Sequence, residues 1–146
     1  MQYTIPPLQF VRRIAIDDRE RCSRLKTALE RNENVKVTVK RLPLGDYQVN
    51  NTLLIERKTL ADFARSVRDC RLFSQVGRLA RERTMRTCLV LEGTTDRYSH
   101  LAIPKPAFRG ALVTVTLVFG LPVLRSATPD ETADLILYAA NQLRRR

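Results

Sequence analysis

The chain has 146 residues, of which 44% are hydrophobic and 28% charged, and its 26 Lys and Arg against 15 Asp and Glu give a formal net charge of +11. This composition fits one compact domain and excludes a disordered chain, while the positive charge, carried mostly by arginine, favours nucleic acid or an anionic membrane surface as a partner. No apolar run is long enough to span a membrane, and the three cysteines lack zinc or disulfide spacing, so we expect an intracellular protein with reduced thiols.

The first part of the chain predicts strands and one helix. Residues 12–17 are an apolar run that ends in acids, which is typical of a buried strand, and residues 20–31 carry a helical apolar stripe. Valines alternate with polar residues over 35–39, which indicates a half-exposed strand. Residues 46–56 predict a hairpin that turns at its two asparagines, because asparagine tolerates a left-handed backbone.

The rest of the chain predicts four helices and two strands. Thr59 is an N-cap candidate for the first of these helices, and Thr128-Pro129-Asp130-Glu131 is a strong start for the last. One apolar, β-branched segment could be helix or strand, and its length and the proline before it favour helix. The helices are predicted over 59–67, 72–83, 107–119 and 128–144, and the strands over 86–92 and 121–124. This order predicts a layered α/β domain.

Asp46, Glu56 and Lys58 give the most informative spacing. Glu56 and Lys58 are two residues apart at the end of a predicted strand, so their side chains point to the same face. Metal-dependent hydrolysis of a phosphodiester needs two carboxylates and a lysine of this kind, because hard oxygen ligands hold Mg²⁺ and an ammonium group orients water or stabilises the phosphate. The same pattern also occurs in ordinary exposed strands.

The geometry of the hairpin decides whether the two carboxylates can act together. Asp46 and Glu56 share a face only if the loop holds an odd number of residues, for example three centred on Asn51, because a two-residue loop would pair Glu56 with Gly45. Asp17 ends the first predicted strand. Because the ends of neighbouring strands converge in a layered sheet, we expect Asp17 as a third carboxylate.

Four ordered blocks of sequence surround these residues: IAIDDRE at 14–20, LPLGDY at 42–47, IERKTLADF at 55–63 and RLFSQVGRL at 71–79. Together they resemble the nuclease domain of the XPF family of structure-specific DNA endonucleases, in register over about residues 12–92. The central signature of that family is Gly-Asp, a variable stretch, Glu-Arg-Lys, three residues and Asp. It stands here as Gly45-Asp46, Glu56-Arg57-Lys58 and Asp62.

The resemblance implies an α/β, restriction-endonuclease-like core, with a central mixed β-sheet flanked by helices. It also implies Mg²⁺-dependent incision of flapped, forked or branched DNA near a junction of duplex and single strand, in repair or recombination, with Mn²⁺ able to replace Mg²⁺. Lys58 would position or activate water. The implied residues are the catalytic set Asp17, Asp46, Glu56, Arg57, Lys58 and Asp62, of which Asp17, Asp46 and Glu56 bind the metal; the supporting Arg19 and Glu20; and the DNA contacts Arg57, Arg71, Ser74 and Gln75.

The last third of the chain bears on assembly. Residues 111–123 and 135–140 are more apolar than a monomer of this size easily buries. Nuclease domains of the XPF family associate through their later strands and helices, so the resemblance implies a homodimer, or a heterodimer with a non-catalytic paralogue. The alternative is that these residues complete the core. No helix-hairpin-helix module follows Arg125, so we expect a single domain that is a minimal nuclease or a fragment.

The sequence lacks the residues that other hydrolase mechanisms require. His100 is the single histidine and no serine lies in a Gly-x-Ser-x-Gly elbow, which argues against zinc, histidine-based and serine hydrolases. No glycine-rich loop suits a nucleotide cofactor. Two classes remain: an active DNA endonuclease and a non-catalytic DNA-binding partner of the same fold. Because Asp46, Glu56 and Lys58 are all present, the first is favoured. An RNA-binding protein is a distant third, since the chain has few aromatic residues for stacking.

Overall fold

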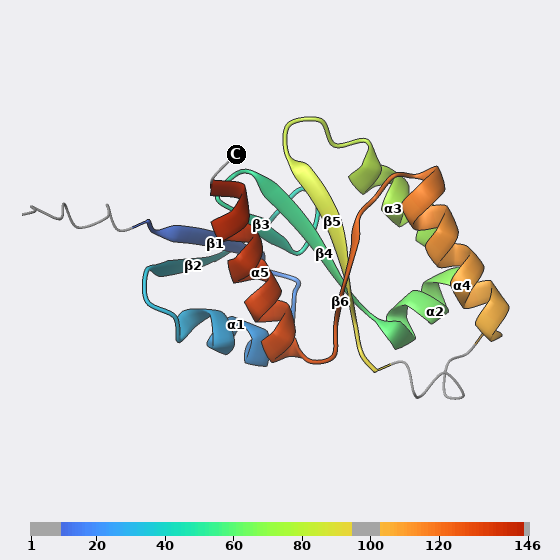
Figure 1. Ribbon diagram of the computed structural model, residues 1–146, viewed down its shortest axis with the longest axis horizontal. Coiled ribbons are helices and arrows are strands. Elements are labelled where there is room, and N and C mark those ends of the chain that lie inside the picture. Colours follow the sequence, from blue (N-terminus) through green and yellow to red (C-terminus); the bar gives the residue numbers. More distant parts are fainter. Residues whose placement is uncertain (1–9, 95–102, 145–146) are drawn as a thin grey trace, which may run out of the picture.

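A single six-stranded β-sheet organises the molecule (Figure 1). The computed structural model describes residues 10–94 and 103–144, so His100 lies outside the described residues. The strand order is β2-β1-β3-β4-β5-β6, and β3 is antiparallel to both of its neighbours while all other pairs are parallel. The strands are β1 (Arg12–Asp17), β2 (Val35–Lys40), β3 (Tyr47–Val49), β4 (Leu53–Thr59), β5 (Arg86–Glu92) and β6 (Val123–Ser126).

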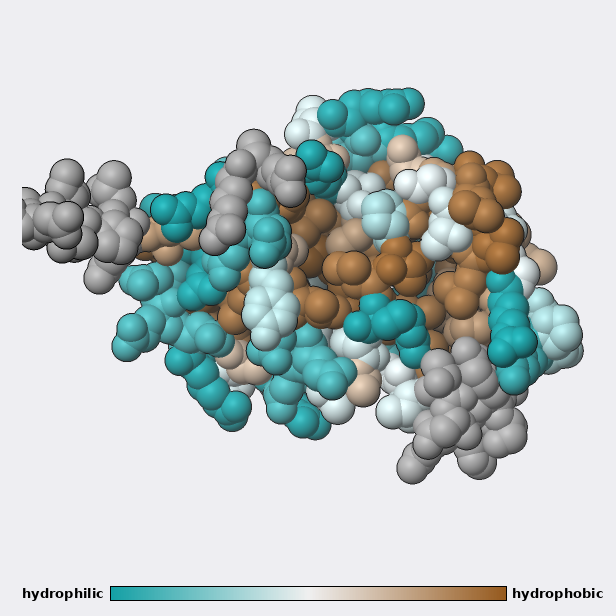
Figure 2. All heavy atoms as spheres, viewed as in Figure 1, coloured by the Kyte–Doolittle hydropathy of each residue, from teal (hydrophilic) through white to brown (hydrophobic). Residues whose placement is uncertain are grey.

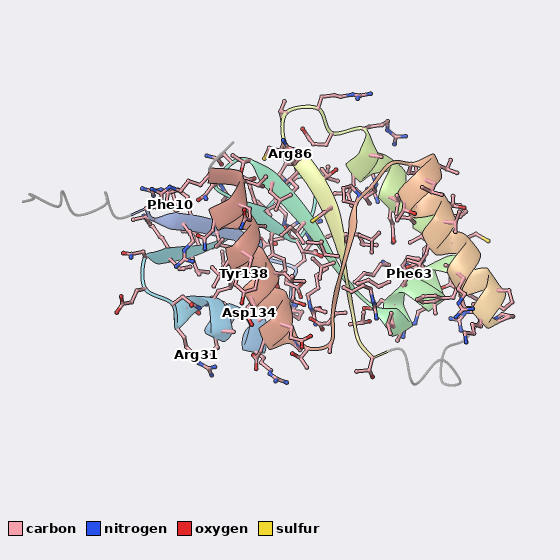
Figure 3. The ribbon with its side chains drawn as sticks, in the orientation of Figure 1. Phe10, Arg31, Phe63, Arg86, Asp134 and Tyr138 are labelled. Carbon is pink, nitrogen blue, oxygen red and sulfur yellow. The ribbon has the colours of Figure 1, made fainter. Side chains whose placement is uncertain are left out.

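Helices cover the two faces of the sheet unequally. On one face, α1 (Ser23–Glu30) and α5 (Pro129–Arg144) pack on a core that draws residues from β1 to β5. On the other, α2 (Leu60–Arg68), α3 (Leu72–Ala80) and α4 (Lys105–Val113) pack over β5 and β6. There Phe63 of α2, which Figure 3 labels, meets Phe108 of α4 at 4.9 Å between ring centroids. The predicted α/β fold with a central mixed sheet flanked by helices is therefore confirmed.

The two cores leave part of the sheet covered on one face only. Residues of β5 alternate between them, since Cys88 and Val90 belong to the first core and Leu89 and Leu91 to the second. The strands β1, β2 and β3 contribute only to the first core. Among the described residues, no helix covers their second face, which is the face that carries the even-numbered residues of β4.

Several predicted elements are confirmed at or near their ends. The strands β1 and β5 have the predicted bounds, and Thr59 caps α2 by accepting a hydrogen bond from the backbone N–H of Asp62 at 3.1 Å. The helix α5 begins at Pro129, directly after Thr128, as predicted. The ambiguous segment is helical, as α4 followed by a π-helix, η2 (Thr114–Val118).

Other boundaries differ from prediction for local reasons. The strand β6 begins at Val123 rather than Leu121, because Pro122 has no N–H to donate to the ladder. The helix α1 begins three residues late, because the Glu20 carboxylate accepts the N–H groups of Arg21 and Cys22 and holds a turn there. All three cysteines are free thiols, and no helix among the described residues is both long and apolar enough to cross a bilayer.

Candidate active site

The β3–β4 hairpin has the loop that the carboxylate pair requires. Val49 pairs with Leu53, which leaves the three residues 50–52 as the loop, with Asn51 at its centre. Asn50 and Asn51 adopt positive φ angles of 50° and 55°, the left-handed region that asparagine tolerates. The predicted odd-numbered loop is confirmed, so Asp46 and Glu56 can lie on the same side of the sheet.

Gly45 allows Asp46 to come close to β4. Its φ is +77°, and a Cβ at this position would lie 3.3 Å from the carbonyl oxygen of Ile55. The N–H of Asp46 donates to that same oxygen at 2.8 Å, and the Asp46 carboxylate accepts the N–H of Arg57 at 2.9 Å. Backbone contacts therefore fix the Asp46 side chain beside Glu56, and a larger residue at 45 would be both strained and crowded.

Two adjoining hollows meet at this pair, and we refer to them together as the carboxylate hollow. Their volumes are about 250 and 260 Å³. They share four lining residues: Arg19, Asp46, Glu56 and Gln75. The first hollow is also lined by Asp17 and Arg78, and the second by Lys58 and Asp62. The carboxylate hollow thus lies at the sheet edge where β1 and β4 end.

The two central carboxylates are in an unfavourable electrostatic setting. Burial, followed by the charge of Glu56, raises the pKa of Asp46 to about 8. Burial also raises the pKa of Glu56, against the opposing effect of Lys58. No described residue donates a hydrogen bond to the Glu56 carboxylate. Two half-buried acids that repel one another favour either a shared proton or a bound cation.

This setting predicts how stability depends on pH when no divalent cation is present. The folded chain keeps protons on Asp46 and Glu56 at pH values where the unfolded chain has released them. In EDTA, the free energy of unfolding should therefore fall as the pH rises from the ordinary value of 3.8 towards about 8, by up to about 1.4 kcal/mol per pH unit for each proton. Urea denaturation across that range measures the slope, and Asp46→Asn should flatten it. An equal slope in both proteins would contradict the prediction.

Lys58 brings a positive charge into the same hollow. Its side chain is 9% exposed, and its Nζ donates to Oε1 of Gln75 on α3 at 2.9 Å. Burial lowers the pKa of Lys58, and the charge of Glu56 opposes that effect. Glu56 and Lys58 both line the second hollow, as their spacing of two residues predicts. Gln75 therefore fixes the position of the ammonium group.

Asp17 lines the carboxylate hollow, and its carboxylate already accepts hydrogen bonds from the chain. It is 2% exposed, and its carboxylate accepts hydrogen bonds from Nε of Arg19 at 2.8 Å and from the N–H of Leu42 at 2.8 Å. The Arg19 guanidinium holds the pKa of Asp17 at about 2. Across residues 10–94 and 103–144, no three Asp, Glu, His or Cys side chains are arranged to hold a metal ion. Asp17 lies in one hollow with Asp46 and Glu56, and its carboxylate is paired with Arg19, so the expected metal-binding role of these three acids stays a prediction.

Comparison with known proteins identifies the family. Residues 16–139 match the ERCC4 domain family. The chain belongs to this family. It is similar to XPF from Aeropyrum pernix, with 34% identity and a TM-score of 0.79, over 92% of this chain and 66% of that one. It is also similar to XPF from Aeropyrum pernix in a complex with DNA, with 32% identity and a TM-score of 0.78, over 91% of this chain and 65% of that one.

Two curated relatives of this ERCC4 domain are longer proteins. The 3′-flap repair endonuclease Xpf of Saccharolobus solfataricus is 29% identical over 85% of this chain and 52% of the relative. A Methanocaldococcus jannaschii protein that carries the name of an ATP-dependent RNA helicase is 33% identical over 89% of this chain and 15% of the relative. The chain thus spans about half or less of their lengths. The resemblance to an XPF-type nuclease domain is confirmed.

Arg57 of the ERCC4 domain lines the second hollow and pairs with two carboxylates. Its guanidinium donates to both carboxylate oxygens of Glu92, at 3.0 Å from Nε to Oε1, and lies 3.6 Å from Oε1 of Glu20. Thr132 of α5 donates to Oε1 of Glu92 at 2.7 Å, and its hydroxyl also contacts Ser126. Arg57 thus lies at the centre of a network that joins β4, β5, β6 and α5 and also lines the second hollow, and its expected catalytic and DNA-binding roles stay predictions.

The remaining predicted residues of the ERCC4 domain lie at the margin of the hollow. Asp62 pairs with Arg65 at 2.9 Å, and Glu20 lines the second hollow beside Arg57. Arg71 is exposed, lines that hollow and pairs with Asp69 at 3.4 Å. Ser74 lines neither hollow; its hydroxyl donates within its own helix at 3.4 Å.

Sequence reasoning missed Arg78 of the ERCC4 domain. It lines the first hollow with Asp17, Asp46 and Glu56, and its charge, like that of Lys58, opposes the rise in the pKa of Glu56 that burial causes. Arg78 follows Gln75 by three residues and Arg71 by seven, so all three lie on one face of α3. That helical spacing was a usable signal, because the face already carried two predicted site residues.

Proposed function

We propose that this chain is a metal-dependent DNA endonuclease that hydrolyses a phosphodiester near a junction of duplex and single strand. The observation that carries the proposal is the half-buried Asp46–Glu56 pair with Lys58 in one hollow, where both acids have raised pKa values. The similarity to an XPF structure in complex with DNA and to a flap endonuclease supports DNA as the substrate. The net charge of +11 supports a polyanionic substrate.

Asp46 and Glu56 fit a divalent cation. They offer hard carboxylate oxygens at one point, and a cation would relieve the repulsion that raises their pKa values. We propose that Mg²⁺ binds here, that Mn²⁺ can replace it, and that Asp17 joins only if its ion pair with Arg19 opens. When bound, the cation supplies a Lewis acid that withdraws charge from a phosphate oxygen.

The other side chains of the hollow would act on the substrate directly. Lys58, held by Gln75, is positioned to orient water or to stabilise negative charge that develops on the phosphate. Arg71 and Arg78, on one face of α3, would contact phosphates on either side of the cleaved bond. The chain's own contribution is therefore to position groups and to supply charge, without a covalent intermediate.

The first experiment is a cleavage assay with end-labelled forked, flapped, single-stranded and duplex DNA, in Mg²⁺, Mn²⁺ or EDTA. Cutting near the junction that requires a divalent cation would support the proposal. Binding without cutting under every metal would favour a non-catalytic DNA-binding partner of the same fold, to which the Asp17–Arg19 ion pair already lends support. Equal cutting in EDTA would contradict the metal dependence.

We also propose that two copies of the chain associate through its C-terminal third. Exposed apolar side chains lie on η2, on β6 and on the outer side of α5. On η2, Leu117 is 79% exposed and Val118 is 74% exposed. Figure 2 shows brown, hydrophobic atoms over the β6 side of the molecule between α5 and α4, and Tyr138 lies on this side of α5 (Figure 3). The strand β6 is also an unpaired sheet edge in the described chain. A second copy would bury both features.

Light scattering after gel filtration tests this association. The wild-type chain should elute at twice the mass of one chain, and Leu117→Asp should shift it to the mass of one chain, because a buried charge opposes the apolar contact. Val39→Asp, at an exposed apolar residue of β2, is the matched control and should leave the mass unchanged. A wild-type monomer at micromolar concentration would overturn the proposal.

A further inference from the structure

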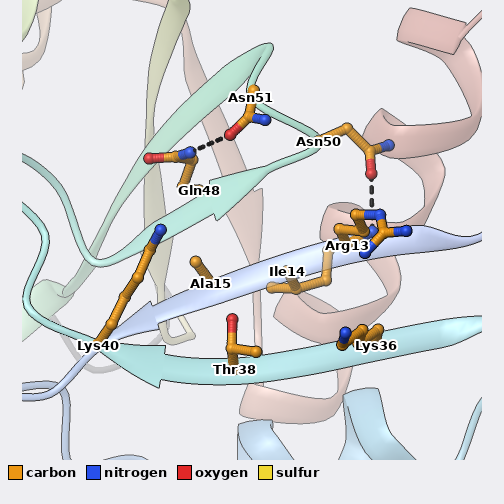
Figure 4. A pocket seen from close by; sticks show the side chains of 9 residues that line it. All are labelled: Arg13, Ile14, Ala15, Lys36, Thr38, Lys40, Gln48, Asn50 and Asn51. Carbon is orange, nitrogen blue, oxygen red and sulfur yellow. Dashed lines mark hydrogen bonds between the residues drawn. The ribbon is translucent and has the colours of Figure 1, made fainter.

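The uncovered half of the sheet carries a basic hollow of its own. It lies on the face of β2, β1 and β3 that no described helix covers, and its volume is about 210 Å³ (Figure 4). We call it the open sheet face. Its polar and basic lining residues are Arg13, Lys36, Thr38, Lys40, Gln48, Asn50 and Asn51. Ala15 forms part of its floor, and this small side chain keeps the centre of the hollow free (Figure 4).

The positive charges of the open sheet face are not neutralised. Arg13, Lys36 and Lys40 line it, and no described Asp or Glu does. No carboxylate of the described residues forms an ion pair with any of the three, whereas the nearby Arg41 pairs with Asp18 at 2.7 Å. The amide groups are held in place, since Gln48 donates to Asn51 and the backbone N–H of Arg13 donates to Asn50 at 2.7 Å. The open sheet face therefore offers fixed donors and free cations to an anion.

Strand register connects the open sheet face with the carboxylate hollow. Lys40 is the register partner of Asp17, which lines the carboxylate hollow, and Lys36 is the partner of Arg13. Lys40 and Lys36 are four residues apart on β2, which separates them by about 13 Å along the strand. The positive charges therefore form a strip that leads away from the carboxylate hollow. Side chains two residues apart in a strand point to one face, so Arg13, Ala15 and Asp17 of β1 share the side that carries Glu56 and Lys58.

We propose that the open sheet face binds the phosphate backbone of the DNA strand that leaves the carboxylate hollow. The inference rests on the proposed function, since it extends the path of that substrate. It specifies backbone recognition, because none of the described residues that line the open sheet face is aromatic and could stack on a base, while lysine and arginine suit phosphates. It also implies a substrate whose arm extends beyond the cleaved bond by enough nucleotides to cross β1 and β2.

The test compares two doubly substituted proteins that lose the same charge. Lys36→Gln with Lys40→Gln removes two cations from the open sheet face. Arg31→Gln with Arg83→Gln is the control: Arg31 lies at the end of α1, on the opposite layer (Figure 3), and Arg83 lies in the exposed turn after α3. All four side chains are exposed, so both proteins should fold. Fluorescence anisotropy in EDTA measures the affinity of each protein for two DNA substrates. The first is a fork with long arms, and the second, the trimmed fork, is the same DNA with each arm cut back to the junction.

The Lys36→Gln, Lys40→Gln protein should bind the long-armed fork about tenfold more weakly than wild type at low salt, with a log–log salt slope smaller by about 1.4 to 1.8, because two phosphate contacts are lost. Its affinity for the trimmed fork, and the affinity of the control protein for both, should stay within about twofold of wild type. If the two variants bind the long-armed fork equally, the open sheet face does not bind DNA. If wild type binds neither fork, the proposed function itself fails.

Discussion

Replacing Asp46 by asparagine is expected to abolish cleavage while preserving the fold. The carboxylate that would bind the cation is lost, so single-turnover cleavage in Mg²⁺ should fall by at least about a hundredfold. The asparagine side-chain oxygen can still accept the N–H of Arg57, which Asp46 accepts at 2.9 Å. Repulsion with Glu56 disappears at the same time, so the free energy of unfolding at pH 8 should be equal to that of wild type or larger.

The matched control for this substitution is Asp18→Asn. Asp18 follows the same strand end as Asp17, is exposed and pairs with Arg41, and it lines neither half of the carboxylate hollow. The control should cut at the wild-type rate. If Asp46→Asn keeps wild-type cleavage, the site is misassigned, and if it unfolds, urea denaturation will separate loss of structure from loss of chemistry.

Replacing Arg57 by alanine is expected to cost more stability than any other substitution at the site. The side chain of Glu92 is 6% exposed and would keep a buried charge with Thr132 as its remaining partner. Breaking a buried pair in this way costs about 3–5 kcal/mol. Urea denaturation at neutral pH should show this loss, and Glu92→Gln in the same chain should restore part of it, because the uncompensated charge is then gone.

Arg41→Ala is the control for this second prediction. The ion pair of Arg41 with Asp18 is exposed, so its loss should cost less than about 1 kcal/mol. A different outcome would reassign Arg57: wild-type stability together with lost cleavage would place its guanidinium on the substrate rather than in the network with Glu92.

Local signals predicted much of the fold. The bounds of β1 and β5 follow from apolar runs, and Thr59 and Thr128 mark helix starts because their side chains can cap the first turn. Two adjacent asparagines predicted the hairpin turn, and the three-residue length of its loop meets the condition for Asp46 and Glu56 to share a face. The apolar run predicts that β6 begins at Leu121, but the strand begins at Val123, because Pro122 has no N–H for the ladder. The π-helix η2 has no comparable local signal in the sequence.

The candidate site was predictable in its residues and not in its contacts. The spacing of Asp46, Glu56 and Lys58 was enough to place them in one hollow. The ion pair of Asp17 with Arg19 is supported by the backbone of Leu42, which hydrogen-bonds to both side chains. No spacing along the chain predicts the contact with Leu42. The pairing of Arg57 with Glu92 needs the parallel contact of β4 with β5, which brings together residues 35 positions apart.

The alternation of β4 divides two tasks between successive residues. Ile55 and Arg57 face α1 and α5 and hold the molecule together, whereas Glu56 and Lys58 face the carboxylate hollow. A single inserted or deleted residue in the loop 50–52 would shift this strand against β3 by one position and exchange the two sets. Ile55 would then face the hollow and Glu56 the apolar core. The length of that loop should thus tolerate no change by one residue, although loops of exposed residues ordinarily vary in length, and families of variants selected for cutting should keep it at three.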